Sequence, residues 1–173
     1  MLPKLSLILG GAASGKSVFA ESLVIADGAP RVYLATAQAF DDEMRRKVTA
    51  HIAQRGTNWR TIETPLGAAD DLAQVAENEL VLLDCATMWL SNHLLAESDL
   101  DAETGRLLNA LETCKGRVVV VSNEVGLDVV PENKLARRFR DAQGKLNQSI
   151  AARADLAALV VAGLPMVLKG KLP

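Results

Sequence analysis

The stretch GGAASGKS, residues 10–17, decides the fold of this chain. It fits the pattern G-x-x-x-x-G-K-[ST], in which a glycine-rich turn points successive backbone N–H groups at phosphate oxygens. The turn follows the apolar run KLSLIL (4–9) and precedes a predicted helix over 16–25, whose positive dipole end would face the phosphate. A glycine turn with a chance lysine does not explain this strand–turn–helix context. The stretch predicts a nucleoside triphosphate site.

The loop gives its residues separate roles. Lys16 would reach the β- and γ-phosphates, and the Ser17 hydroxyl would hold Mg²⁺. The apolar run ELVLLD ends in Asp84, an acid at a strand tip that could bind Mg²⁺ directly or through water. Ser17 and Asp84 are therefore the predicted metal ligands. The predicted nucleotide-binding residues of the loop are Gly10, Gly11, Ala12, Ala13, Ser14, Gly15, Lys16 and Ser17.

Strands and helices alternate outward from the loop. The sequence predicts strands at 4–9, 31–37, 79–84, 117–124 and 156–163, the last of which closes the chain, and an extended stretch at 58–65. It predicts helices at 16–25, from 41 onward, and at 86–96, 101–113 and 133–153. The β-branched run RVVVVSNE (117–124) is typical of a central strand. Strands that are apolar on both faces indicate a parallel sheet covered on both sides. We predict one α/β domain, 1–173, with a P-loop NTPase fold and a mostly parallel, RecA-like sheet.

Composition limits the classes of function. The net charge of −2 argues against a broad nucleic-acid surface, and no apolar run has the length of a membrane span. The N-terminal apolar run leads directly into the glycine turn, so we interpret it as a strand and not as a signal peptide. Cys85 and Cys114 lack metal-type spacing and are expected to be reduced thiols. We expect a cytoplasmic protein.

Two classes of nucleotide protein can be compared with the sequence. A signalling GTPase needs an Asn-Lys-x-Asp guanine reader, but the nearest stretch, NKLA (133–136), has Ala136 in the acidic position. A small-molecule kinase needs a lid with arginines, which Arg137, Arg138 and Arg140 could supply. A solvated helix face explains these arginines equally well.

One of the two histidines lies in a charged, helix-like stretch, DDEMRRKVTAHIAQRG (41–56). On a helix, Lys47 and Arg55 would flank His51 in one row. Their charges disfavour the imidazolium, and a neutral imidazole beside a phosphate is a competent nucleophile. A histidine that merely packs at the border of the core is the alternative, and the residues alone favour it.

Longer motifs resemble one family. The stretches YLATAQAFDDEM, RRKVTAHIAQRG, NWRTIETPL, LLDCATMWLSN, VVSNEVG, VPENKLARRFRDAQGKLNQSIA and VVAGLPMVLK follow GGAASGKS in the order seen in the bifunctional adenosylcobinamide kinase/adenosylcobinamide-phosphate guanylyltransferases of cobalamin synthesis. The resemblance covers nearly the whole chain. It implies that ATP or GTP phosphorylates the aminopropanol hydroxyl of adenosylcobinamide. GTP then guanylylates the matching histidine, His51, and adenosylcobinamide phosphate takes the GMP to give adenosylcobinamide-GDP.

The resemblance also implies further residue roles and partners. His51 and Lys16 would be catalytic, and the Glu63 carboxylate would accept hydrogen bonds from guanine N1 and N2, although a surface acid on an edge strand is the simpler explanation. His93 has no counterpart and is expected to be structural. Adenosylcobinamide and its phosphate would be the substrates, and the chain would form a homotrimer. Outside the loop, the implied nucleotide contacts are Leu34, Ala35, Thr36, Ile52, Ala53, Gln54, Arg55, Glu63 and Asp84.

Two rival functions stay open at this point. One is a kinase-only P-loop enzyme in which His51 merely packs. The other is a nucleotide-gated regulatory module that turns over no small molecule, which the missing Asn-Lys-x-Asp reader disfavours.

Overall fold

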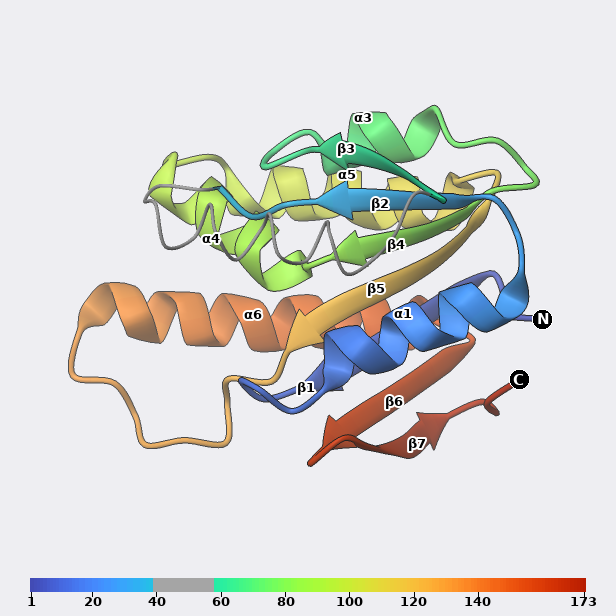
Figure 1. Cartoon of the computed structure of the whole chain (residues 1–173). Coiled ribbons are helices and arrows are strands. Elements are labelled where there is room, and N and C mark those ends of the chain that lie inside the picture. Colours follow the sequence, from blue (N-terminus) through green and yellow to red (C-terminus); the bar gives the residue numbers. More distant parts are fainter. Residues whose placement is uncertain (39–57) are drawn as a thin grey trace.

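The computed structural model describes residues 1–38 and 58–173 (Figure 1). Its strands are β1 (Leu5–Gly10), β2 (Arg31–Ala35), β3 (Trp59–Glu63), β4 (Leu80–Asp84), β5 (Arg117–Asn123), β6 (Leu156–Val161) and β7 (Leu164–Lys169). Its helices are α1 (Lys16–Asp27), α3 (Ala68–Ala73), α4 (Ala86–Leu95), α5 (Leu100–Thr113) and α6 (Lys134–Arg153). The helix predicted from residue 41 onward lies outside the described residues.

The strands form one sheet in the order β3-β2-β4-β5-β1-β6-β7. All neighbours pair in parallel except β6 and β7, which are antiparallel. β5 lies between β4 and β1, so the prediction of a central strand at 117–124 is confirmed. Because parallel strands end at the same edge, the tips of β1, β5 and β4 lie next to one another at the carboxyl edge of the sheet.

Helices cover both faces of the sheet (Figure 1), as predicted. On one face α1 packs Ala20 and Val24 against alternate residues of the central strands, among them Val119 and Val121. On the opposite face α4, α5 and α6 pack against the other set, which includes Val118 and Val120. A strand buried on both faces needs an unbroken β-branched run, which explains the composition of β5.

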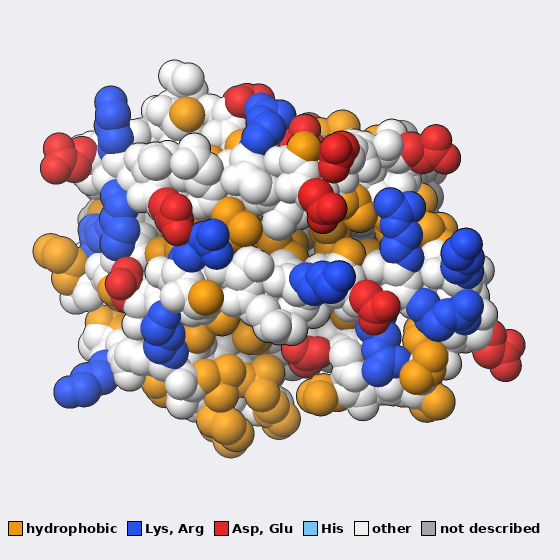
Figure 2. Space-filling model, turned by 180° about the vertical axis from the view of Figure 1, so that it is seen from behind, with side chains coloured by type: hydrophobic (Ala, Val, Ile, Leu, Met, Phe, Trp, Pro, Cys, Tyr) orange, Lys and Arg blue, Asp and Glu red, His pale blue; other side chains and the backbone are white. Residues whose placement is uncertain are grey.

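The prediction that the strand at 156–163 is the last one is wrong. β6 ends at Val161, and a two-residue turn of Ala162 (φ 51°) and Gly163 (φ 77°) leads into the antiparallel strand β7. Hairpin turns with two positive φ values usually carry Asn-Gly or Asp-Gly, so the pair Ala162-Gly163 did not indicate a hairpin in the sequence. The short helix α3 was not predicted either. β7 leaves large apolar side chains exposed, and Figure 2 shows apolar atoms gathered along that edge of the molecule.

A buried ion pair ties the end of α1 to the start of β5. The Asp27 side chain is 3% exposed and accepts hydrogen bonds from both terminal nitrogens of Arg117, at 2.5 and 2.7 Å. The backbone N–H of Leu2 donates to the same carboxylate at 2.8 Å. The hydrogen bonds from Arg117 are the main reason that the pKa of Asp27 lies below its ordinary value, although burial opposes the shift.

Replacing Arg117 by methionine is expected to lower the free energy of unfolding by about 3–5 kcal/mol, because a buried carboxylate then loses its partner. In the wild type the folded pKa of Asp27 is lowered. The contribution of the pair is therefore complete above the unfolded pKa of about 3.9 and is lost as the pH falls through the lowered folded value. Urea unfolding at neutral pH and at about pH 3 measures both effects. Arg106→Met, which breaks an exposed ion pair with Asp70, should leave the midpoint nearly unchanged. Equal midpoints for the two variants would contradict this account.

Candidate nucleotide site

The loop between β1 and α1 is held tightly against the rest of the sheet. A Cβ atom at Gly10 would lie 2.3 Å from Ser14 Oγ and 2.8 Å from the carbonyl oxygen of Val160, so no side chain fits there. Gly15 has φ 90°, a conformation that favours glycine, and its Cα faces Gly163. The Gly163 N–H donates to the Ser14 carbonyl at 2.8 Å. The turn between β6 and β7, which the sequence did not predict, therefore braces the loop.

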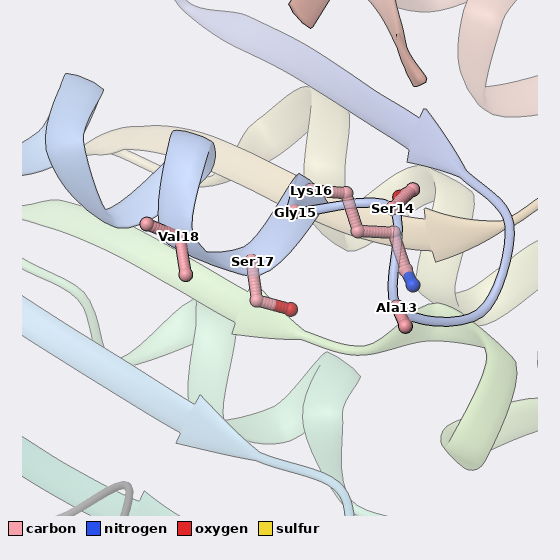
Figure 3. Close-up of a pocket in the computed structure, with 6 residues that line it drawn as sticks. All are labelled: Ala13, Ser14, Gly15, Lys16, Ser17 and Val18. Carbon is pink, nitrogen blue, oxygen red and sulfur yellow. The ribbon is translucent and has the colours of Figure 1, made fainter. Parts of the chain in front are cut away.

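The loop surrounds a hollow of about 310 Å³ (Figure 3), lined by Ala13, Ser14, Gly15, Lys16, Ser17 and Val18. The first turn of α1 carries no acidic residue and no side-chain cap, so its N–H groups are free to bind an anion. Ser14 Oγ is buried and has no hydrogen-bond partner within the described part of the chain. Lys16 Nζ lies over the loop and donates to the Gly11 carbonyl at 3.0 Å. These groups suit a polyphosphate.

Asp84 lies at the tip of β4, where Tyr33 holds its carboxylate. The Tyr33 hydroxyl donates to Asp84 Oδ2 at 3.1 Å, and the Ser17 side chain points from α1 toward this end of β4 in Figure 3. Within residues 1–38 and 58–173, no group of three or more His, Cys, Asp and Glu could hold a metal. A magnesium ion would therefore need nucleotide phosphates to complete the ligands that Ser17 and Asp84 offer.

The thiol of Cys85, next to Asp84, is unreactive because it stays protonated. Burial, with a smaller contribution from the Asp84 charge, raises the pKa of Cys85 to about 11, so the thiol stays protonated at neutral pH. Its sulfur accepts a hydrogen bond from the N–H of Met88 at the start of α4. Cys114 is buried and also free. The prediction of reduced thiols is confirmed.

The residues predicted at the end of β2 differ in what they can offer a ligand. Leu34 is fully buried in the core, so its side chain does not reach the edge. Ala35 pairs with both Asp84 and Glu63, which places the three residues in a row across β4, β2 and β3. Glu63 is exposed at the end of the outer strand β3. Their contacts with a nucleotide stay predictions.

Thr36 uses its hydroxyl to fix the backbone beside Asp84. Its Oγ1 accepts from the Cys85 N–H and donates to the Cys85 carbonyl, both at 2.7 Å. The Thr36 carbonyl accepts from Asn92 Nδ2 at 2.8 Å. Thr36 is fully buried, so in this structure its side chain positions the tip of β4 and is not open to a ligand.

Replacing Thr36 by valine is expected to lower the free energy of unfolding by about 2 kcal/mol or more, because two buried backbone groups of Cys85 lose their partner. Thr36→Ser keeps the hydroxyl and loses one methyl, so it should cost about 1 kcal/mol. Urea unfolding of both variants tests this. A serine variant as unstable as the valine variant would show that the hydroxyl does not carry the effect.

Other predicted residues fall into two groups. His51, Ile52, Ala53, Gln54 and Arg55 lie outside the described residues. Arg137 donates to the carbonyl oxygens of Pro131 and Glu132, and Arg140 donates to that of Gly126, so both brace the loop before α6. These bonds favour a structural role for the two arginines over a phosphate lid.

The second histidine is structural, as predicted. His93 is 4% exposed, and its Nδ1 and Nε2 lie 3.1 and 3.2 Å from Ser98 Oγ and the Leu66 carbonyl oxygen. Its ring packs against Trp89.

Sequence reasoning gave no role to a buried polar cluster at the tip of β5. Ser122 Oγ donates to Asn147 Oδ1 at 2.6 Å, and Gln143 Nε2 donates to both atoms at 2.9 Å. Asn147 Nδ2 and Thr87 Oγ1 then bond the carbonyl and the N–H of Asn123. The available signal was the pair Gln143 and Asn147, four residues apart on the buried stripe of a helix.

Comparison with known proteins decides the family. The sequence model of the family described as cobinamide kinase / cobinamide phosphate guanyltransferase, or CobU, matches residues 6–168. The chain belongs to the CobU family. The resemblance drawn from the motifs is confirmed.

Two relatives of this CobU-family chain carry bifunctional names. The bifunctional adenosylcobalamin biosynthesis protein CobP of Pseudomonas aeruginosa is 49% identical over 168 residues, which cover 95% of this chain and 97% of the relative. The protein CobU of Escherichia coli K12, which has the same bifunctional description, is 40% identical over 180 residues, covering 94% and 98%.

Solved structures support the fold of the CobU-family chain. The RadB recombinase matches with a TM-score of 0.55 and 18% identity over 91% of this chain and 74% of that chain. A type III secretion ATPase matches with a TM-score of 0.56 and 14% identity over 96% and 57%. At this identity the likeness concerns the fold alone, and it confirms the α/β P-loop prediction. None of the described helices is long and apolar enough to span a membrane.

Proposed function

We propose that this chain catalyses both reactions in its family's description, first as a cobinamide kinase and then as a guanylyltransferase. The observation that carries the proposal is a complete phosphate loop at the end of β1, with Lys16 at the start of α1 and Asp84 at the tip of β4, one strand away across β5, in a chain that matches the family from residue 6 to 168. The expected substrates are adenosylcobinamide and its phosphate, with ATP or GTP as the phosphate donor.

In the kinase reaction, the aminopropanol hydroxyl oxygen attacks the γ-phosphorus of the triphosphate. A bond forms between that oxygen and phosphorus as the hydroxyl gives its proton to a base, the bond from the γ-phosphorus to the β-bridging oxygen breaks, and the nucleoside diphosphate leaves with that electron pair. The loop N–H groups and the Lys16 ammonium hold the phosphates and stabilise the charge that develops on them. Mg²⁺, when held by Ser17 and Asp84, would neutralise further charge on the phosphate oxygens.

In the guanylyl reaction, we propose that a nitrogen of His51 attacks the α-phosphorus of GTP and that pyrophosphate leaves. A phosphate oxygen of adenosylcobinamide phosphate then attacks the same phosphorus, the bond from nitrogen to phosphorus breaks, and adenosylcobinamide-GDP forms. A neutral imidazole suits this role because its free lone pair needs no prior loss of a proton.

Guanine recognition is assigned to Glu63 at the outer end of the row Asp84, Ala35, Glu63. Neighbouring strands lie about 4.8 Å apart, so the β3 tip is roughly 10 Å from the β4 tip. A nucleotide with its phosphates at the loop and its base toward β3 would lie along this edge. We further propose that the chain acts in the cytoplasm as a homotrimer, for which the exposed apolar side chains of β7 offer a surface.

The experiment that tests the proposal supplies the purified protein with adenosylcobinamide, Mg²⁺ and either ATP or GTP. Mass spectrometry should detect adenosylcobinamide phosphate with a suitable donor and adenosylcobinamide-GDP only with GTP. A reaction that stops at the phosphate would favour the kinase-only enzyme. Slow GTP hydrolysis that cobinamide does not change would favour the regulatory module. Either result would overturn the proposal.

A further inference from the structure

The residue after β5 lies directly beside the phosphate loop. Asn123, the last residue of β5, pairs with Gly10 on β1, and Val121 pairs with Asp84 on β4. The N–H of Glu124 donates to the Gly10 carbonyl at 3.1 Å. A γ-phosphate held between Lys16 and Asp84 would therefore face the tip of β5, because this strand lies between β1, which leads into the loop, and β4, which ends at Asp84.

The backbone next to Glu124 is fixed by two of the helices on one face of the sheet, α4 and α6. Thr87 of α4 accepts the Asn123 N–H at 2.7 Å, and Asn147 of α6 donates to the Asn123 carbonyl at 3.0 Å. The buried cluster around Ser122 thus holds the strand tip in one place. A group that must meet a reacting atom within a few tenths of an ångström benefits from such support.

The Glu124 side chain is half-buried and has one oxygen engaged. Oε1 accepts from the Gly126 N–H at 2.7 Å, and a Cβ atom at Gly126 would lie 2.9 Å from that oxygen. Within residues 1–38 and 58–173, neither lysine nor arginine forms an ion pair with Glu124. The turn therefore orients the carboxylate, and its second oxygen is able to accept a proton.

We propose that Glu124 is the general base of the kinase reaction, an inference that rests on the proposed function. As the acceptor oxygen bonds the γ-phosphorus, its proton moves to the free oxygen of Glu124, the bond to the β-bridging oxygen breaks, and the diphosphate leaves with that electron pair. Asp84 is less suited because Tyr33 and the metal site engage it. The guanylyl reaction needs no such base, since its nucleophile is a neutral nitrogen.

The test replaces Glu124 by glutamine, which keeps the volume and an oxygen that accepts from Gly126 but cannot take the proton. We expect the rate of adenosylcobinamide phosphorylation to fall about 100-fold or more. Covalent labelling by GTP, and GMP transfer to supplied adenosylcobinamide phosphate, should stay at the wild-type rate. Asp128→Asn is the matched control, because this exposed acid lies in the same loop and, among residues 1–38 and 58–173, its side chain accepts a hydrogen bond only from the Val129 N–H. It should leave both reactions unchanged.

Two results would overturn the inference. If Glu124→Gln phosphorylated adenosylcobinamide at the wild-type rate, Glu124 would not be the general base. If the rates of both reactions fell equally, Glu124 would only support the fold of the site. Glu124→Asp keeps a carboxylate and provides a second test if Glu124→Gln misfolds. It should phosphorylate adenosylcobinamide faster than Glu124→Gln does. An equal loss of rate in the two variants would also contradict the role of Glu124 as general base. Failure of the proposed function is distinguishable, because it shows in the wild type, which would then lack one or both products, whereas failure of this inference shows only in the Glu124 variants.

Discussion

Replacing His51 by alanine is expected to abolish covalent labelling of the protein by GTP that carries ³²P at the α-phosphorus. The variant lacks the nitrogen that would displace pyrophosphate, and no other group on the chain is proposed to form that bond. The label on the wild type should be lost in mild acid and kept in base, as for phosphorus bound to a histidine nitrogen. The same variant should still phosphorylate adenosylcobinamide, because that reaction uses the loop and not the imidazole.

The second histidine provides the control. His93→Gln changes a buried ring that contacts Ser98 and the Leu66 carbonyl, so it should lose stability and keep its labelling per folded molecule. Labelled protein that persists in His51→Ala, or label that disappears in His93→Gln, would place the guanylyl group elsewhere.

The sequence was sufficient for the loop and the parallel sheet because both depend on local patterns. A glycine turn needs particular residues at fixed spacing, and a strand buried on both faces needs an unbroken apolar run, as at Val118 to Val121. The tip of β4 at Asp84 followed from the same logic. These features depend little on distant parts of the chain.

What the sequence missed depends on contacts between distant segments. The hydrogen bond from the Gly163 N–H to the Ser14 carbonyl forms at the turn where β7 folds back after β6. Ala-Gly is not one of the usual sequences of such a turn, so the sequence did not predict this hairpin. Thr36 was predicted from the resemblance to touch nucleotide, yet its hydroxyl is engaged by Cys85, 49 residues away. The cluster of Ser122, Gln143 and Asn147 joins a strand to a helix, and single-residue patterns carry no sign of such a partner.

Replacing Lys16 by alanine is expected to slow both reactions by about 100-fold or more, the cost of removing one donor from developing charge. In the kinase reaction the ammonium contacts the transferred γ-phosphoryl group and the leaving β-phosphate. In the guanylyl reaction those same two phosphates leave together as pyrophosphate, so one cation stabilises the leaving group in both. Rates of adenosylcobinamide phosphorylation and of covalent labelling measure the two effects, and the thermal midpoint controls for the lost bond to Gly11.

The pattern across three variants tests whether one phosphate site serves both reactions. His51→Ala should remove only the second reaction, Glu124→Gln only the first, and Lys16→Ala both. If Lys16→Ala slowed phosphorylation and left labelling intact, the GTP that guanylylates the protein would have to bind at a second site, elsewhere on the chain or on a neighbouring copy. A common loss instead follows from the proposed pose, in which a triphosphate bound at the start of α1 would present its γ-phosphorus toward β5 and keep its α-phosphorus on the side of β2 and Glu63.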